Sequence, residues 1–256
     1  MKDVKLGNHT VMLYNSIDEL PIIRFHRYNK MLLIDAGLGG DLSSIDGHIE
    51  RAVRFINGGH KQEAATEMEN IRQTIYLILQ DMNPKHLAFA ALVKEIDGKP
   101  CEDISDDGLR RTLELLSDVT VKDMTAESEA VKKKIDDELT LYYPDIFESA
   151  NEKEYYDIMK RRTQVMLDAV QNGETDERKA EIERLTDKLV CFTKPKSFTG
   201  KDSAEIAYDK AFDEMCIMIG KELNCDVKKY TVTEYYGAYQ YIKKQANKQK
   251  RQNKTR

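Results

Sequence analysis

The chain has 256 residues, of which 41% are apolar and 33% charged, and it contains 13 Gly, 5 Pro and no Trp. This composition can build a core, and many charges with few turn formers favour surface-charged helices over an all-β fold. The formal net charge is −5, and the stretch 243–256 holds seven Lys or Arg and no acid. The other residues therefore carry −12, so we expect a mainly α protein with an acidic body and a basic tail.

The sequence lacks the features of an exported or membrane-embedded protein. Its first ten residues have no apolar run, and no stretch approaches the roughly 18 apolar residues of a membrane span. The four cysteines lack metal-ligand spacing, which favours reduced thiols and predicts neither metal nor cofactor. The four cysteines are Cys101, Cys191, Cys216 and Cys225. We expect a cytoplasmic protein that does not contact a membrane.

The chain is predicted to open with a small β-hairpin followed by a helix. Two β-prone pieces, 4–6 and 10–14, can pair around a Gly-Asn turn. Ser16 with Glu19 three residues later matches a capping box and predicts a helix that continues to about Ile34.

A glycine cluster at 37–40 ends that first helix. It lacks the Gly-Lys-Ser/Thr ending of a phosphate loop, and Leu42 stands where a dinucleotide motif needs its last glycine. We therefore interpret it as a turn between two helices.

Two amphipathic helices are predicted next, over about 43–56 and 61–81. Each carries an apolar row at helical spacing. The rows are Ile45, Ile49, Val53 and Ile56, then Ala64, Met68, Ile71, Ile75, Ile78 and Met82. Gly58 and Gly59 separate the two helices.

The remaining elements follow from caps, stripes and turns. Helices are expected from Pro84 through Leu92, then over 105–116, 122–141, 151–170, 174–189 and 204–223, and from Thr231, with short strands near 93–104. Residues 192–200 are expected to be an extended connector. We predict a multi-helix, bundle-like globular fold with a main helical domain at 1–190, a C-terminal helical segment at 201–242 and a basic flexible tail at 243–256.

Catalytic motifs are weak in this chain. The five histidines are scattered and none forms a metal-binding pair, and the acids at 106–107 and 136–138 suit a helix N-terminus and a solvated helix face. There is no Gly-x-Ser-x-Gly motif and no thiol beside an obvious base. We therefore expect a binding protein and not an enzyme.

Two segments are predicted to contact a protein partner. Their residues are Arg24, Phe25, His26, Arg27 and Tyr28, and Tyr235, Tyr236, Tyr239 and Ile242. Tyrosine offers a large contact area at little entropic cost, which suits an interface, although the same rings could cover the protein's own core. The basic tail could contact nucleic acid or serve as a solubilising end, and the acidic body disfavours a main nucleic-acid face.

Three segments together resemble the tail-assembly chaperones and morphogenesis proteins of tailed bacteriophages. They are Ser16–His26, Lys134–Leu139 with Tyr142–Pro144, and Thr231–Tyr236. The resemblance implies a non-enzymatic factor in the host cytoplasm that keeps a structural protein soluble, such as a tape-measure or other tail protein. A virion component such as a connector or ring subunit, and an enzyme with an unrecognised site, are the alternatives.

Overall fold

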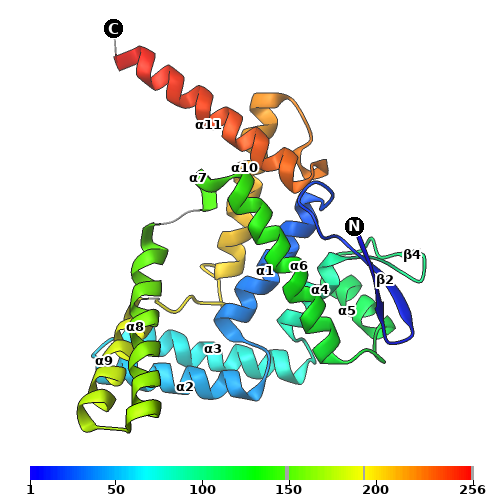
Figure 1. Cartoon of the computed structure of the whole chain (residues 1–256). Helices are drawn as coiled ribbons and strands as arrows, with labels where there is room; N and C mark the ends of the chain where they lie inside the picture. Colours follow the sequence, from blue (N-terminus) through cyan, green and yellow to red (C-terminus); the bar gives the residue numbers. More distant parts are fainter. Residues whose placement is uncertain (148–149, 193, 255–256) are drawn as a thin grey trace.

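A computed structural model describes residues 1–147, 150–192 and 194–254 of the chain (Figure 1). The predicted mainly α fold is confirmed: helices dominate, and the strands form one small sheet. The strands are β1 (Lys2–Leu6), β2 (His9–Leu13), β3 (Val93–Ile96) and β4 (Lys99–Pro100). The helices are α1 (Ile22–Leu38), α2 (Leu42–Asn57), α3 (Lys61–Leu79), α4 (Pro84–Leu92), α5 (Asp106–Leu115), α6 (Val121–Tyr142), α7 (Pro144–Phe147), α8 (Ala150–Asn172), α9 (Asp176–Phe192), α10 (Ala204–Leu223) and α11 (Val232–Lys254).

The sheet has the antiparallel order β1-β2-β3-β4. The predicted N-terminal hairpin is confirmed, with Val4 opposite Val11, and β2 then pairs with β3 through Val11 and Ile96. The last strand ends earlier than the predicted 93–104 region because the chain turns toward α5. Asp103 Oδ1 accepts the Ser105 backbone N–H at 2.9 Å, which prepares Ser105 to cap that helix.

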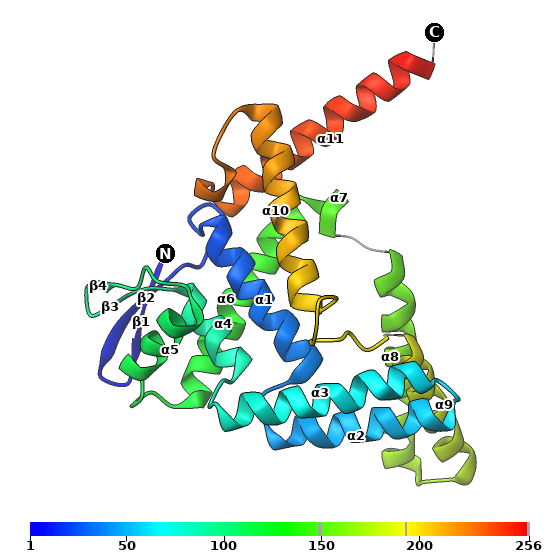
Figure 2. The same cartoon turned by 180° about the vertical axis from the view of Figure 1, so that it is seen from behind.

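Helix α1 crosses the middle of the molecule, with α4 and α6 on one side and α10 on the other (Figures 1 and 2). Its inner residues join one hydrophobic core with the sheet, α4 and α6. The stripe predicted on α6 is buried, since Val131, Ile135 and Leu139 are all less than 4% exposed. Helix α4 begins as expected, with Asn83 capping Lys85 and Pro84 at the first helical position.

The start of α1 differs from the prediction. Residues 16–20 form a turn and the helix begins only at Ile22. Proline disfavours helical backbone in the residue before it, so Pro21 delays the helix. The hydroxyl of Ser16 does not cap this helix and instead lies 3.1 Å from the carboxylate of Glu138 on α6. The first predicted capping box is therefore wrong.

Two helical hairpins occupy the end of the molecule farthest from α11 (Figure 2). The first is α2–α3, which passes below the C-terminal end of α1, and the second is α8–α9, which lies beside it. The α2–α3 hairpin is tied to α1 through the reversal at 39–41, where Gly39 has φ +70°. Gly37 allows a close approach, because a Cβ there would lie 2.2 Å from the Phe198 ring.

The C-terminal helices pack on α1 at the other end. The second predicted capping box is confirmed: Thr231 Oγ1 accepts the Glu234 N–H and Glu234 accepts the Thr231 N–H. Helix α11 continues to Lys254, so the segment expected to be a flexible tail extends the helix. Ile219 and Tyr235 belong to the same hydrophobic core as α1, and the division at 201–242 stays a prediction.

A candidate partner-binding surface on the α2–α3 hairpin

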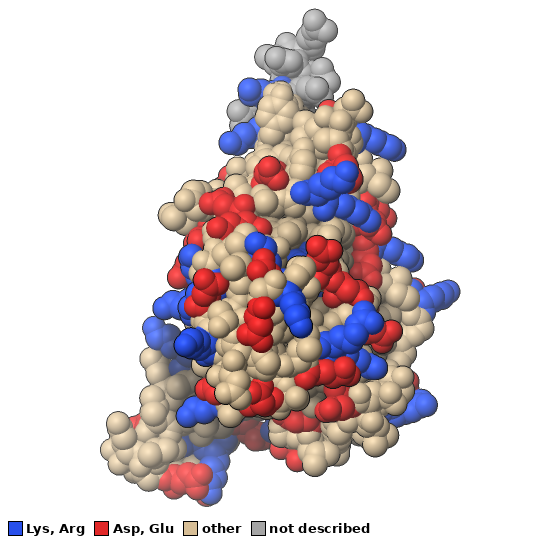
Figure 3. Space-filling view, turned by 90° about the vertical axis from the view of Figure 1, so that its right-hand side faces the viewer, with Lys and Arg blue, Asp and Glu red and all other residues tan. Residues whose placement is uncertain are grey.

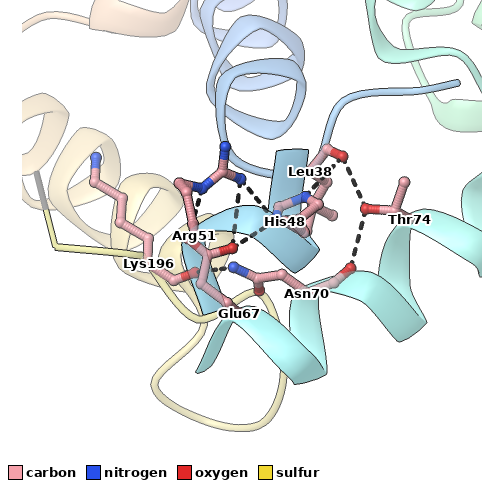
Figure 4. Close-up of polar contacts among 7 residues, drawn as sticks. All are labelled: Leu38, His48, Arg51, Glu67, Asn70, Thr74 and Lys196. Atoms are coloured by element: carbon pink, nitrogen blue, oxygen red, sulfur yellow. Dashed lines mark hydrogen bonds and ion pairs between the residues drawn. The ribbon is translucent and has the colours of Figure 1, made fainter. Parts of the chain in front are cut away.

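The inner face of the α2–α3 hairpin carries a buried polar cluster (Figure 4). His48 and Glu67 are only 1% and 2% exposed, and His48 Nδ1 lies 2.5 Å from Glu67 Oε2. Arg51 Nε donates to the other carboxylate oxygen of Glu67 at 2.8 Å. A buried carboxylate is costly unless it is paired and hydrogen-bonded, and here both oxygens have partners.

The same cluster anchors the hairpin to its neighbours. The Leu38 carbonyl, at the C-terminal end of α1, lies 3.1 Å from His48 Nε2 and 2.8 Å from the donating Thr74 hydroxyl. The last carbonyls of a helix lack partners within the helix, so these two side chains satisfy one of them. Asn70 donates through Nδ2 to the Lys196 carbonyl at 3.0 Å. The hairpin is thus fixed to α1 and to the connector before α10.

The electrostatics of the cluster favour a charged Glu67. Burial by itself raises the pKa of this carboxyl, but the hydrogen bonds from His48 and Arg51 more than offset it and hold the pKa below its ordinary value. The carboxylate therefore stays ionised and attracts Arg51. The contacts among His48, Arg51 and Glu67 therefore hold α2 against α3, and the polar side chains lie between the two helices.

The outer face of the hairpin carries many exposed apolar side chains, with the exposed Arg72 between Met68 and Ile75 on α3. On α2, Ile49, Val53 and Ile56 follow the i, i+4, i+7 spacing of one helix face, and Met68, Ile75 and Leu79 share a face of α3. Viewed along each helix from its N-terminus, the exposed row is rotated in the same direction away from the residues that face the other helix. Because the two helices are antiparallel, the two exposed rows therefore lie on the same side of the hairpin. We call this surface the hairpin apolar face. It comprises Leu42, Ile49, Val53, Ile56, Met68, Ile75, Tyr76 and Leu79, each 41–77% exposed.

A groove runs between this hairpin and α9. Arg54 on α2 bridges to Glu183 at 2.6 Å and to Asp187 at 2.7 Å, which fixes the two elements together. The groove beside this bridge is lined by Val53 of α2 and Val190 of α9. The apolar surface of α2 therefore continues toward the second hairpin.

The sequence shows the apolar rows, but it does not show whether each row is buried or exposed. A row of this kind normally faces the core, whereas Ile49, Val53 and Met68 are half exposed. Of the two predicted rows, Ala64 is buried. The other buried positions are His48, Ala52 and Phe55 on α2 and Glu67, Asn70 and Thr74 on α3. One sequence feature could have identified the buried faces. Each helix has a second row of polar residues at helical spacing, and the charges of the two rows are complementary and could pair across the hairpin.

The first predicted contact segment is mostly internal. Arg24, Phe25 and Tyr28 are no more than 7% exposed, and Arg24 donates to the carbonyls of Ala91 and Val93. The remaining two residues of this segment are partly exposed but paired. His26 stacks on Tyr208 and Phe212 and contacts Asp209, and Arg27 pairs with Asp106.

The second predicted contact segment packs against the first. Tyr235 is 7% exposed, and the ring of Tyr236 lies 6.4 Å from that of Phe25 and 5.2 Å from that of Phe147. Tyr239 and Ile242 are half-buried against the same core. The structure therefore brings the two segments together, but as parts of the protein's own core. Partner binding through them stays a prediction that their burial does not favour.

The remaining sequence features carry less chemistry. Figure 3 shows one face of the molecule, on which basic and acidic side chains are interspersed. Within the described residues, no group of three or more His, Cys, Asp or Glu could hold a metal ion. Cys101, Cys216 and Cys225 are free thiols, whereas the side chain of Cys191 lies outside the described residues. None of the helices described is both long enough and apolar enough to cross a bilayer.

Fold and surface together define a mainly α protein with a polar-centred helical hairpin and an exposed apolar face. No family model matches the chain, and comparison with curated proteins and with solved structures found no match either.

Proposed function

We propose that this chain is a non-catalytic protein-binding factor that docks a partner on the hairpin apolar face. The observation that carries the proposal is the exposure of eight large apolar side chains on one side of two packed helices. Contiguous exposed apolar surface is characteristic of protein interaction sites. The polar cluster inside the hairpin supports this use, because it holds the two helices in place without their outer rows.

The occupant that suits this surface is an amphipathic helix of a structural protein. Two parallel ridges of apolar side chains form the kind of groove into which such a helix lays its apolar face. Burying the exposed half of each side chain contributes about 1 kcal/mol, or about 8 kcal/mol for the face. Association itself costs about 4–15 kcal/mol, so the face alone supports reversible binding and not permanent assembly.

The resemblance to tail-assembly chaperones suggests a biological setting for this reversible binding. We propose a phage morphogenesis factor that acts in the host cytoplasm and holds a tape-measure or other tail protein until assembly. A reversible apolar contact suits such a role, because the partner must later be released. The proposal rests on the resemblance for its setting and on the hairpin apolar face for its mechanism.

Co-expression with the products of the neighbouring genes tests this function. The tagged chain is expected to retain a tail protein, and replacing Ile49, Val53 and Ile56 together by Ser is expected to abolish retention. The matched control is Ile206→Ser with Ile217→Ser, which removes exposed apolar side chains of α10. Retention unaffected by the α2 variant, or lost equally with the control, would contradict the proposed surface.

The alternative is a virion component such as a connector or ring subunit, in which copies of the chain assemble permanently. Native mass spectrometry of the chain alone separates the two roles. A chaperone is expected to give a monomer or small oligomer, whereas a connector or ring subunit gives a closed ring.

A further inference from the structure

A cavity of about 520 Å³ lies between the two helical hairpins, on the side of α2–α3 opposite the hairpin apolar face. Its walls come from the C-terminal half of α1, from α2 and α3, from α8 and α9, and from the connector at 194–196. This size falls within the range of about 300–1,000 Å³ that small-molecule sites occupy. Leu33, Ala36 and Leu189 supply an apolar wall.

The cavity is strongly basic in a protein that is acidic overall. Its lining includes Arg51, Arg162, Lys194 and Lys196, against the single acid Glu67. That acid is already neutralised by its ion pair with Arg51. Lys194 also has an acidic partner, because its Nζ lies 3.4 Å from Glu63 Oε1. Arg162 and Lys196 therefore supply the excess of positive charge, which a bound anion would balance.

Two of the basic groups are held with part of their hydrogen-bonding capacity unused. Arg162 is fixed through Nε, which donates to Thr186 Oγ1 at 2.8 Å, and its terminal nitrogens have no hydrogen bond within the described residues. Arg51 likewise uses Nε and one terminal nitrogen on the hairpin cluster. Planar guanidinium groups match the oxygens of a phosphate through paired hydrogen bonds.

The wall beside these groups is rigidly built. Asn70 is 1% exposed and its amide holds the backbone of Lys196 at the cavity. Its Oδ1 is buried without a hydrogen-bond partner in the described residues, which is unusual for a buried polar atom. This oxygen has almost no accessible surface, so it belongs to the packed wall and does not face the open cavity.

We propose that this cavity binds a small phosphorylated molecule, with Arg51, Arg162 and Lys196 on the phosphate and the apolar wall against the organic part. This site is separate from the proposed partner surface, and either can exist without the other. A phosphate monoester carries close to two negative charges at neutral pH, which suits the excess charge better than a single carboxylate.

Isothermal titration calorimetry with ribose 5-phosphate, inorganic phosphate and succinate tests the proposal on the full chain. We expect saturable binding of ribose 5-phosphate that is tighter than that of succinate and weakens with added salt. Arg162→Gln removes charge-assisted hydrogen bonds and should weaken binding about tenfold. Arg72→Gln on the outside of α3 removes the same charge away from the cavity and should leave binding unchanged.

Lys196→Ala provides a second variant, because this side chain is exposed and its loss leaves the hairpin cluster intact. It is expected to weaken ribose 5-phosphate binding several-fold. The proposal is overturned if no phosphorylated probe binds saturably, if succinate binds as tightly as ribose 5-phosphate, or if Arg72→Gln weakens binding as much as Arg162→Gln. None of these results bears on partner retention by the hairpin apolar face.

Discussion

The two ends of this protein are built on opposite packing schemes. At one end, α1, α10 and α11 enclose aromatic rings, including Phe25, Phe212, Tyr235 and Tyr236, in an apolar interior. At the other end, the α2–α3 hairpin encloses His48 and Glu67 and leaves its apolar rows outside. Both ends consist of amphipathic helices with clear apolar rows, so the rows alone do not tell which side is buried.

The difference has an energetic basis. The aromatic end is stabilised by burial of large apolar surface, which requires no particular partner geometry. The hairpin buries Ala52, Phe55 and Ala64 and adds a few directional contacts, each of which leaves a buried polar group unsatisfied when its partner is removed. The first scheme uses its apolar surface for folding, whereas the second leaves that surface available for binding.

The largest expected effect is at the aromatic end. Phe25→Ala removes a buried ring at the α1–α11 contact and should lower the free energy of unfolding by about 3–5 kcal/mol. Urea denaturation followed by circular dichroism measures it. Tyr241→Ala, in which the ring is 54% exposed, is the control and should stay within about 0.5 kcal/mol of the parent. A loss below about 1 kcal/mol for Phe25→Ala would contradict the buried contact.

The next effect is at the centre of the hairpin. Glu67→Gln keeps the shape of the side chain but removes the charge that His48 and Arg51 contact. Breaking a buried pair costs about 3–5 kcal/mol, and since Arg51 is 38% exposed we expect about 2 kcal/mol. The same denaturation experiment applies. Glu69→Gln, on the outside of α3, is the matched control, and equal losses for the two variants would show that the cluster contributes nothing.

The hairpin should also respond to pH through Glu67. The folded pKa of Glu67 lies below its ordinary value of 4.5, so its carboxylate contributes stability above that value and loses it as pH falls through the folded pKa. The difference in unfolding free energy between the parent and Glu67→Gln should therefore be constant near neutral pH and shrink in acid. Denaturation of both proteins at several pH values measures this difference. A difference that grows in acid would reverse the assigned sign.

A smaller effect is expected at the start of α11. Thr231→Ala removes the hydroxyl that accepts the Glu234 backbone N–H and should lower the free energy of unfolding by about 1 kcal/mol. Thermal unfolding is a sufficient measurement, and Thr231→Ser, which keeps the hydroxyl, serves as the control. If both variants lose the same stability, the cap contributes nothing and the packing of α11 alone sets its start.

The smallest expected effect on stability is on the hairpin apolar face. Val53→Ser and Leu79→Ser alter side chains that are already 49% and 77% exposed, so each should change the unfolding free energy by no more than about 0.5 kcal/mol. Measured by urea denaturation, this result would separate a binding surface from a core. A loss comparable with that of Phe25→Ala would mean that these rows support the fold.

Local sequence signals predicted the positions of helices and strands better than they predicted which side chains are buried. Ser105, Asn83 and Thr231 cap the helices expected of them. Ser16 has an acid three residues later, as Thr231 has, but it does not cap a helix because Pro21 follows and its hydroxyl contacts Glu138 of a distant helix. A capping motif therefore makes a helix start possible at a position. A nearby proline and tertiary contacts determine whether the helix begins there.

The sequence by itself determined the helical class, the N-terminal hairpin and most helix positions, because caps, turns and apolar spacing act over a few residues. Only the tertiary structure decided which faces are buried. It placed Phe25 against Tyr236 and His48 against Glu67, pairs separated by 211 and 19 positions. Such pairings depend on how whole helices cross, which no local pattern encodes. The predicted contact segments consequently became core, and two rows with the pattern of core faces became the candidate binding surface.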